Sequence, residues 1–305
     1  MIEVVCCLDD SFVEYSGLML DSLFVHNPTE NFRVHIILNS TACAKTKGRL
    51  SELGKKFSYE FCFYTVSHDL IKSFPRKEKD HISVSAYIRL FMADLLPDNI
   101  DKVLYLDGDM IVVDSIKELW ETKIDDVMVA AVEERYPFDT DSPDRLCYPR
   151  EYSYFNSGVM MVNLKKWRET NFSHRCLELI QNHPERIHLH DQDVLNALVY
   201  NQKIFISIRW NLMDFFVYKR PHIQDRRIDD WKEAIQHPAI IHFTGKRKPW
   251  RHFCDSPYRD FYINFAKSRG WKVQNRASAL HYFMRKGLYK LINKKKTMKV
   301  PMPGK

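Results

Sequence analysis

The chain has 305 residues, which is enough for one large domain or two small ones with a substantial buried core. Its hydrophobic fraction of 45% and charged fraction of 28% exclude disordered and fibrous classes of protein. The net charge of +7 comes from the C-terminal end, because residues 261–305 contain twelve Lys and Arg and no Asp or Glu.

The absence of several sequence motifs excludes further classes of protein. The nine glycines form neither a G-x-G-x-x-G segment nor a Walker loop, which argues against a glycine-cradled nucleotide site. No run of about 18 apolar residues occurs, and the N-terminus has no basic stretch before an apolar one. We therefore expect a chain that neither spans a membrane nor is secreted. Seven cysteines without C-x-x-C or zinc-like spacing predict reduced thiols in a cytosol.

Short β-rich runs alternate with amphipathic stretches along the chain. This alternation predicts an α/β fold in which a mixed central sheet is flanked by helices. Helices are predicted at residues 13–26, 43–57 and 85–96. Strands are predicted at 2–8, 32–38, 59–66 and 103–106, and near 127–132, 157–162, 203–208 and 239–243. We expect one large domain over residues 1–255 and a basic helical region over residues 256–305.

Two aspartates follow the apolar strand predicted at residues 103–106. Asp107 and Asp109 flank Gly108, and in extended geometry both carboxylates would leave the same face of the chain. Two like charges at this spacing repel, and a divalent cation is the simplest group that makes the arrangement favourable. The end of a buried strand is also where open α/β sheets bind ligands. The segment therefore predicts a metal site.

Two other interpretations of this segment remain open. The first is a solvated Asp-Gly-Asp turn in a hairpin. The second is a phosphatase with an aspartyl nucleophile, which also begins with an apolar strand and Asp-x-Asp. That class favours Thr or Val at the fourth position after the first Asp, where this chain has Ile111.

His242 closes a short apolar strand and is followed by Gly245 and by three cations that end at Lys248. A histidine at such a position is often a hydrogen-bonded structural residue. Cations beside a glycine, however, suit a diphosphate, which needs positive charge and N–H donors. If His242 joins the two aspartates, the mixed oxygen and nitrogen ligands favour Mn²⁺ over Mg²⁺.

Two polar segments lie between these sites, one around Asn156 and one from His190 to Asn196. The second segment fits a helix N-terminus with an acidic first turn before an apolar helical run. It equally fits a cluster of short acceptors and amides that hold sugar hydroxyls. Spacing alone leaves both interpretations open.

Taken together, these segments resemble glycosyltransferase family 8, and specifically its bacterial lipopolysaccharide galactosyl- and glucosyltransferases. The order and number of the segments carry the resemblance, which runs from the first strand to about Trp250. The segments are Leu8-Asp9-Asp10, His81-Ile-Ser-Val-Ser-Ala-Tyr87-Ile-Arg89-Leu, Tyr105-Leu-Asp-Gly-Asp109, Phe155-Asn-Ser-Gly158, Leu164-Lys-Lys-Trp167, Asp191-Gln-Asp193 and His242-Phe-Thr-Gly245 with Lys248-Pro-Trp250.

The resemblance implies a Rossmann-like fold of the glycosyltransferase A type over residues 1–255. It also implies a retaining hexosyltransferase with a UDP-galactose or UDP-glucose donor and Mn²⁺. The ion would be held by Asp107, Asp109 and His242. Uridine and phosphate contacts would come from Asp9, Asp10, Phe12, Gly108, Gly245 and Lys248. The donor sugar would be surrounded by Arg89, Asn156, Asp191 and Gln192.

The resemblance places Gln192 nearest to the anomeric carbon, between Asp191 and Asp193, and these three residues are the catalytic candidates. An amide is a poor nucleophile compared with a carboxylate. We therefore expect the acceptor to attack from the same face, with a leaving phosphate oxygen taking its proton. The metal and Lys248 would stabilise the departing diphosphate.

The C-terminal region predicts a surface for partners. Apolar residues in 280–292 recur at helical spacing while Arg and Lys fall elsewhere on the wheel, so a basic amphipathic helix is expected to lie on an anionic membrane. The alternative is a terminal helix packed on the core. No nucleic acid is expected as a partner, because the rest of the chain is net acidic. The protein would then be cytoplasmic and attached to the inner face of the plasma membrane.

The acceptor is expected to be a saccharide, such as a lipooligosaccharide or another cell-surface glycan. His81, Glu134 and the loop around Leu189 are candidates to line its site. The competing non-enzyme hypothesis is a peripheral membrane adaptor with a degenerate transferase core.

Overall fold

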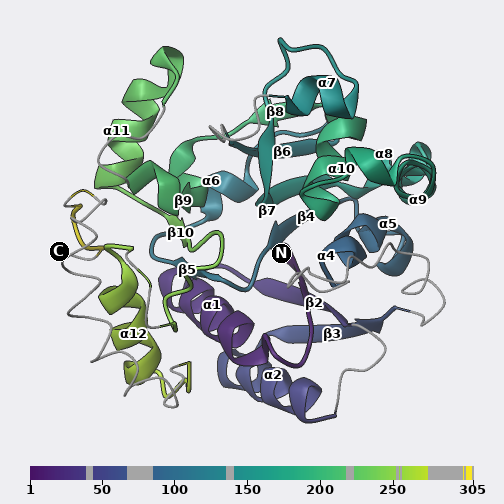
Figure 1. The fold of residues 1–305 in the computed structure, drawn as a ribbon. Helices are drawn as coiled ribbons and strands as arrows, with labels where there is room; N and C mark the ends of the chain where they lie inside the picture. Colours follow the sequence, from purple (N-terminus) through teal and green to yellow (C-terminus); the bar gives the residue numbers. More distant parts are fainter. Residues whose placement is uncertain are drawn as a thin grey trace. The chain divides into compact units, whose positions relative to one another are not determined.

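The structure is a computed structural model, shown in Figure 1. It describes residues 1–38, 44–66, 85–134, 141–217, 223–251, 254, 256–273, 298 and 300–303. The chain divides into two compact units built from interleaved segments. The first comprises Met1–Val13, Asn27–Gly108 and Ile116–Ile206, and the second comprises Glu14–His26, Asp109–Ser115 and Ser207–Lys305. The predicted division at residue 255 stays a prediction.

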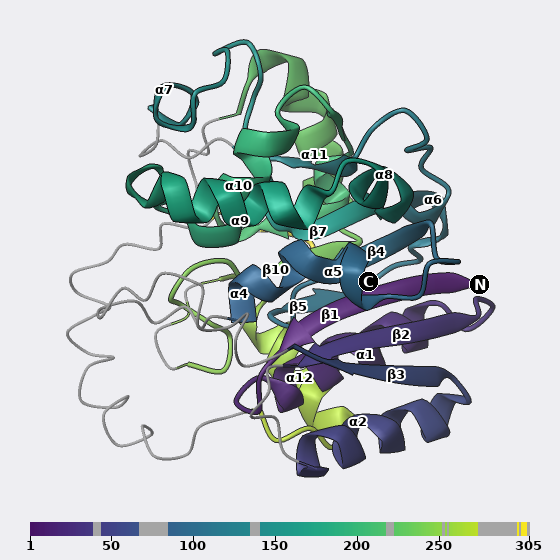
Figure 2. The same cartoon turned by 90° about the vertical axis from the view of Figure 1, so that its right-hand side faces the viewer.

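The first unit is organised around a seven-stranded mixed sheet in the order β3-β2-β1-β4-β7-β6-β8, most of which can be followed in Figure 2. Strands β1, β2, β3 and β4 are mutually parallel, β7 is antiparallel to β4 and β6, and β8 is parallel to β6. The bounds are β1 Ile2–Leu8, β2 Phe32–Leu38, β3 Glu60–Thr65, β4 Lys102–Leu106, β6 Val129–Glu133, β7 Phe155–Asn163 and β8 Lys203–Phe205. The α/β prediction is confirmed, and β4 lies at the centre, as its apolar run indicated.

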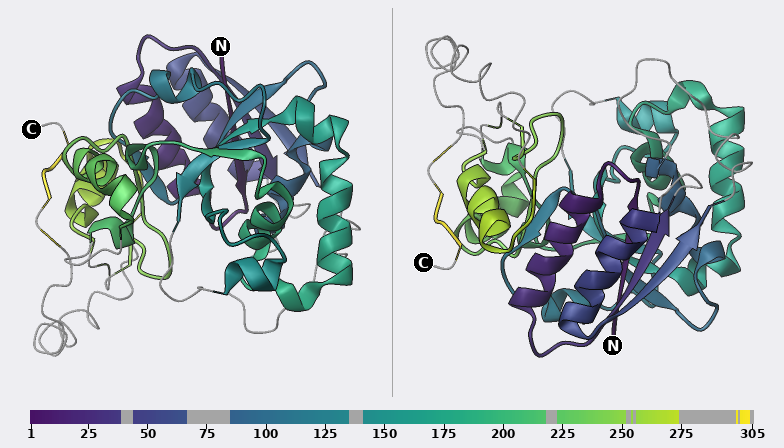
Figure 3. Two further views of the ribbon diagram at one scale, coloured as in Figure 1. Left: turned by 90° about the horizontal axis from the view of Figure 1, so that it is seen from above. Right: turned by 90° about the horizontal axis from the view of Figure 1, so that it is seen from below.

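Helices flank this sheet. Their bounds are α2 Ala44–Phe57, α4 Ser85–Ile88, α5 Met92–Leu95, α6 Lys117–Trp120, α7 Ser142–Leu146, α8 Leu164–Glu169, α9 Phe172–Asn182 and α10 His190–Val199, with a 3-10 turn at Pro184–Arg186. Helix α9 contacts both α8 and α10 (Figures 1 and 2), while α2 runs along β3 (Figure 3). A large buried cluster that includes Tyr105, Phe155 and Trp167 joins α4, α5, α8, α9 and α10 to one face of the sheet. This core holds the carboxyl ends of β1 and β4 in fixed positions.

The helix predicted at residues 85–96 is interrupted. A 3-10 turn at Arg89–Phe91 separates α4 from α5. Such turns inside a helix often mark functional positions. Here the turn begins with Arg89, whose buried guanidinium is held by ion pairs.

The second unit contains a three-stranded sheet in the order β5-β10-β9. Strand β10 is antiparallel to β5 and parallel to β9. The bounds are β5 Met110–Val112, β9 Leu212–Met213, β10 Ile240–His242, α1 Val13–His26, α11 Ile228–Gln236 and α12 Arg259–Ser268, with 3-10 turns at Ile208–Asn211, Asp214–Val217 and Asp225–Arg227. No described helix is both long enough and apolar enough to cross a bilayer.

The end of α12 is tied to α1. The fully buried Asp21 carboxylate forms an ion pair of 2.8 Å with Arg269 and accepts a hydrogen bond of 2.8 Å from Trp271 Nε1. The Trp271 ring lies so close to Gly17 that a Cβ there would stand 2.3 Å from it. Residues up to 271 are therefore part of the folded unit. The tail helix predicted at 280–292 lies outside the described residues.

The Asp-Gly-Asp segment connects strands of two different sheets. Strand β4 ends at Leu106, and the chain continues into β5, which belongs to the other sheet. Asp107 N donates to Gly158 O at 2.9 Å, whereas Phe243 N donates to Asp109 O at 3.0 Å, so each aspartate is bound to a different sheet. The two aspartates therefore do not lie on one extended strand. The hairpin alternative is excluded as well, because β4 pairs with β1 and β7, and β5 pairs with β10.

Candidate active site and metal centre

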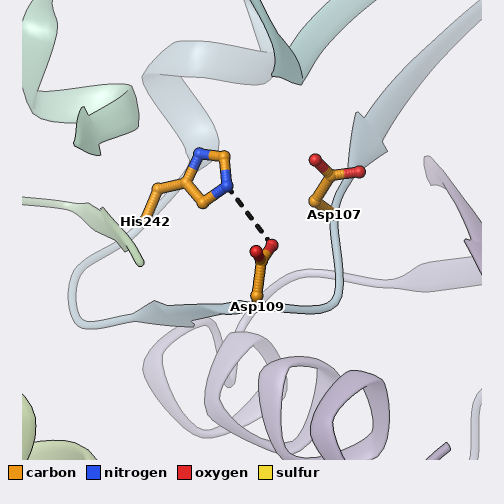
Figure 4. Close-up of side chains that lie close together, drawn as sticks. All are labelled: Asp107, Asp109 and His242. Atoms are coloured by element: carbon orange, nitrogen blue, oxygen red, sulfur yellow. Dashed lines mark ion pairs between the residues drawn. The ribbon is translucent and has the colours of Figure 1, made fainter. Parts of the chain in front are cut away.

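Three predicted metal ligands come together. One ligand atom from each of Asp107, Asp109 and His242 lies within 4.8 Å of the others (Figure 4). His242 Nε2 and Asp109 Oδ1 are 3.2 Å apart, and both of these side chains are buried. Two carboxylates and one imidazole suit a divalent cation that accepts oxygen and nitrogen ligands. This chain can therefore hold a metal ion at these residues, as predicted.

Asp109 also contacts a cation of the chain. Lys248 Nζ forms an ion pair with Asp109 Oδ2 and donates a hydrogen bond of 2.7 Å to the carbonyl of Phe243. Burial by itself would raise the pKa of Asp109, but Lys248 and His242 outweigh burial and lower the pKa. The carboxylate is therefore ionised, which is the form that binds a metal.

The loop between His242 and Lys248 depends on a glycine. Gly245 has a φ of +71°, in the left-handed region that residues with a Cβ rarely adopt. A Cβ there would meet no atom within 4 Å, so backbone conformation and not crowding explains the glycine. The turn at Gly245 leads the chain back so that Lys248 reaches Asp109.

The other metal candidate, Asp107, is held within the first unit. Its Oδ1 accepts a hydrogen bond of 2.7 Å from the Tyr105 hydroxyl and lies 2.9 Å from Arg89 Nη2. The Arg89 guanidinium lies over the Tyr105 ring, 4.5 Å from its centroid. These contacts orient the carboxylate at the end of the central strand.

Arg89 connects Asp107 to Asp191. Its Nε lies 3.1 Å from Asp191 Oδ2, and its Nη1 donates to the Ser157 carbonyl at 3.1 Å. Burial raises the pKa of Asp191 to about 6, although Arg89 opposes this shift. The result is a buried polar surface whose groups can both donate and accept, which suits sugar hydroxyls.

The Gln192 amide is held in one orientation. Its Oε1 accepts from the backbone N–H of Ser157 and from Asn156 Nδ2, each at 3.0 Å. A backbone N–H can only donate, so the amide nitrogen of Gln192 must point the other way, where it donates to Glu134 Oε2 at 2.9 Å. Glu134 also accepts from Asn156 at 3.0 Å. Position along the chain suggested Glu134 for the acceptor site, but not its contact with Gln192.

Asp193 has a different environment from its two neighbours. It is fully buried and accepts from Arg145 at 2.7 Å, from the Tyr154 hydroxyl at 2.7 Å, and from the backbone N–H groups of His188 and Leu189 at 2.7 and 2.8 Å. These bonds hold the start of α10, as the structural interpretation of this segment predicted. The catalytic assignment of Asp193 stays a prediction, and its contacts favour a positioning role.

The predicted uridine residues lie at the end of β1. Asp9 Oδ1 accepts from the backbone N–H of Ser11 at 2.9 Å, and Phe12 N donates to Asp9 O at 3.0 Å, which forms a tight turn. Asp10 accepts a hydrogen bond from the Thr46 hydroxyl. Because β1 and β4 are parallel neighbours, Asp9 and Asp107 follow strands that end at the same edge of the sheet.

Sequence reasoning missed two residues of this region. Arg145 neutralises Asp193, and Asn211 contacts His242, with Oδ1 of the amide 2.9 Å from Nδ1 of the ring. The buried Asp193 implied a partner, but nothing in the spacing pointed to Arg145. The acceptor candidate His81 lies outside the described residues.

Comparison with known proteins gives one consistent result. Residues 3–254 match the model for "Glycosyl transferase family 8". The chain is 31% identical over 284 residues to "General stress protein A" of Bacillus subtilis, covering 90% of this chain and 96% of that protein. It is 26% identical over 275 residues to "Lipopolysaccharide 1,3-galactosyltransferase" of Salmonella typhimurium, covering 87% and 77%.

A solved structure of the galactosyltransferase LgtC, in complex with donor and acceptor sugar analogues, superimposes with a TM-score of 0.78 at 24% identity. The match covers 88% of this chain and 96% of that one. At this identity the likeness establishes the fold.

Proposed function

The chain belongs to glycosyl transferase family 8, and from that premise we propose that it moves a galactose or glucose from a UDP-sugar to a saccharide, with retention at the anomeric carbon. Membership of the family implies a nucleotide-sugar donor and a saccharide acceptor. The identity of the hexose and of the nucleotide is the proposed part. The observation that carries it is the close approach of Asp107, Asp109 and His242, which suits a metal-bound diphosphate.

We propose Mn²⁺ as the ion, because the ligand set mixes carboxylates with an imidazole. When bound, the ion would supply positive charge to the diphosphate as it leaves. Lys248 would add a second positive charge to the same phosphates, with backbone N–H groups at Gly108 and Gly245 as further donors. The turn at Asp9, with Asp10 and Phe12, would receive the uridine.

The sugar would be held by the network around Arg89. Asp191 would accept hydrogen bonds from its hydroxyls, and Asn156, which contacts the Gln192 amide, would donate hydrogen bonds to them. In the transfer step, the bond from the anomeric carbon to the phosphate oxygen breaks while a bond to the acceptor oxygen forms on the same face of the sugar. The acceptor proton passes to the leaving phosphate oxygen, so no protein group needs to become covalently attached.

One observation favours a second mechanism. The Glu134 carboxylate lies 2.9 Å from the amide nitrogen of Gln192, and a carboxylate is a far better nucleophile than an amide. In that alternative, Glu134 attacks the anomeric carbon while the bond to the phosphate oxygen breaks and UDP leaves. The acceptor oxygen then displaces the glycosyl ester, which restores the Glu134 carboxylate, and the acceptor proton passes to the released UDP. Both routes retain the configuration, but they differ in whether a glycosyl–protein adduct forms.

The first experiment is a panel of UDP-sugars incubated with the full chain, with and without Mn²⁺. We expect slow hydrolysis of UDP-galactose or UDP-glucose that needs Mn²⁺ and stops when EDTA removes it. Phosphate release without a nucleotide preference would instead support the phosphatase hypothesis. An absence of turnover and of UDP binding would support the adaptor hypothesis.

We further propose that the acceptor is a glycolipid and that the basic region of residues 256–305 binds an anionic membrane at the inner face of the plasma membrane. The support is the positive charge of residues 261–305, which contain no acidic residue. Replacing Lys294, Lys295 and Lys296 with Gln should weaken flotation with anionic liposomes and leave donor hydrolysis intact. The matched control replaces three exposed lysines of α2, Lys45, Lys55 and Lys56. Equal flotation of the two triple variants would reject the membrane proposal.

A further inference from the structure

We infer that Asn211 is a positioning residue for the metal centre, because its amide oxygen holds the His242 imidazole in the tautomer that directs Nε2 toward the ion. The inference rests on the proposed manganese function and deepens it. Asn211 is fully buried, and its Oδ1 lies 2.9 Å from His242 Nδ1. On the opposite side of the ring, Nε2 lies 3.2 Å from Asp109 Oδ1. The ring is thus held between an amide and a carboxylate.

The backbone around Asn211 is fixed by its neighbours in the second unit. Asn211 ends a 3-10 helix and directly precedes β9, whose Met213 is opposite His242 in the parallel pair with β10. Two residues earlier, the carbonyl of Arg209 accepts from Ala239 N at 2.9 Å. These bonds on both sides of Asn211 set its distance from His242. The amide oxygen is therefore part of the sheet structure and not of a loose loop.

The chemistry of the contact decides the tautomer. An amide oxygen only accepts, so Nδ1 of the ring must carry the proton that it donates. In a neutral imidazole, Nε2 then carries the lone pair and faces the Asp109 carboxylate. Two electron-rich atoms facing one another at 3.2 Å favour a cation that both can bind. The Asn211 contact therefore selects the form of His242 that a metal needs.

The amide of Asn211 also carries no charge, which matters for the net charge around the ion. Asp107 and Asp109 bring two negative charges to the site, where Arg89 and Lys248 bring two positive ones. A carboxylate at position 211 would orient the ring equally well but add a third negative charge near the ion. Asn211 orients His242 without changing the charge of the site. Replacing it with Asp should therefore preserve the orientation, whereas replacing it with Leu should remove it.

The test measures Mn²⁺ binding to the full chain in the presence of UDP, using electron paramagnetic resonance of free Mn²⁺. Pulsed measurement of the ¹⁴N coupling then reports directly whether an imidazole is bound to the ion. Asn211→Leu should weaken Mn²⁺ binding roughly 10- to 100-fold and lose the ¹⁴N coupling. Asn211→Asp should keep the coupling and bind at least as tightly as the wild type. The matched control is Asn182→Leu, at the exposed end of α9, which should change neither quantity.

The outcomes separate the inference from the proposed function. A wild type without Mn²⁺ binding, or without ¹⁴N coupling, would overturn both. A wild type that binds Mn²⁺ through an imidazole, with an Asn211→Leu variant that does the same at similar affinity, would overturn only the inference. Loss of the coupling in Asn211→Asp would also overturn it. If Asn211→Leu does not fold, Asn211→Ala takes its place with the same expected loss.

Discussion

Two buried aspartates, one in each unit, respond to burial in opposite ways. Burial raises the pKa of Asp191 to about 6, and its ion pair with Arg89, which is shared with Asp107, does not offset burial. Burial would raise the pKa of Asp109 too, but Lys248 and His242 together lower it. Burial therefore prevails at Asp191, whereas the ion pair with Lys248 keeps Asp109 ionised.

This difference matches the proposed roles. Asp109 stays ionised and can bind a metal throughout the physiological range. Asp191 gains or loses a proton near pH 6, which suits a group that exchanges hydrogen bonds with hydroxyls. Four sets of substitutions test the two units, starting with the largest expected effect.

Asp109→Asn should remove a metal ligand and leave Lys248 without its carboxylate partner. We expect kcat for donor hydrolysis in Mn²⁺ to fall on the order of 10³-fold. The control is Asp126→Asn at an exposed turn of the first unit, which should leave kcat unchanged. A variant at position 109 that keeps more than a tenth of the wild-type rate would contradict the assigned role.

Asp191→Asn should change how stability depends on pH. A folded-state pKa of about 6, above the unfolded value, means that the folded protein binds more protons between about pH 4 and pH 6. Stability therefore falls as pH rises through this window, by up to roughly 3 kcal/mol from this group. Asn cannot titrate, so the variant should lose this component of the fall. Urea unfolding of both proteins from pH 4 to pH 7 measures the difference, and parallel curves would contradict the prediction.

Gln192→Ala and Glu134→Gln compare the two mechanisms within the first unit. Same-face attack predicts that Gln192→Ala lowers kcat only about tenfold and that Glu134→Gln has an effect of similar size, since both act by positioning. A covalent route predicts near-complete loss for Glu134→Gln alone. Mass spectrometry of the wild type after mixing with UDP-sugar should detect no glycosyl adduct, and an adduct on Glu134 would establish the covalent route.

Gly245→Ala and Gly48→Ala form a matched pair with the smallest effects. At neither position would a Cβ meet an atom within 4 Å, so only backbone conformation distinguishes them. Gly245→Ala should lower the free energy of unfolding by about 1–2 kcal/mol, because its φ is left-handed. Gly48→Ala, within α2, should raise it by about 1 kcal/mol. An unchanged or raised free energy of unfolding for Gly245→Ala, measured in urea, would show that the loop at Gly245 tolerates a side chain.

Much of the fold could be predicted from local pattern. The bounds predicted for β1, α1 and β2 are those observed. Apolar periodicity sets the elements, and Pro28 stops the helix, and both effects act over only a few positions. The strand predicted at 203–208 is shorter, because Ser207 caps a 3-10 helix that begins at Ile208 and ends at Asn211. The helix at 85–96 is interrupted at Arg89, whose burial depends on carboxylates far away in the sequence.

By itself, the sequence determined the order of strands and helices, the buried central strand, and the residue types that can bind a cation. Only the tertiary structure decided that Asp107 and Asp109 join different sheets, that Glu134 meets Gln192, and that Asn211 meets His242. The physical reason is the distance along the chain over which each interaction acts. Periodicity and turn chemistry act between neighbours in the chain, whereas a hydrogen bond between residues 31 or 58 positions apart exists only where the packing of whole strands and helices brings them together.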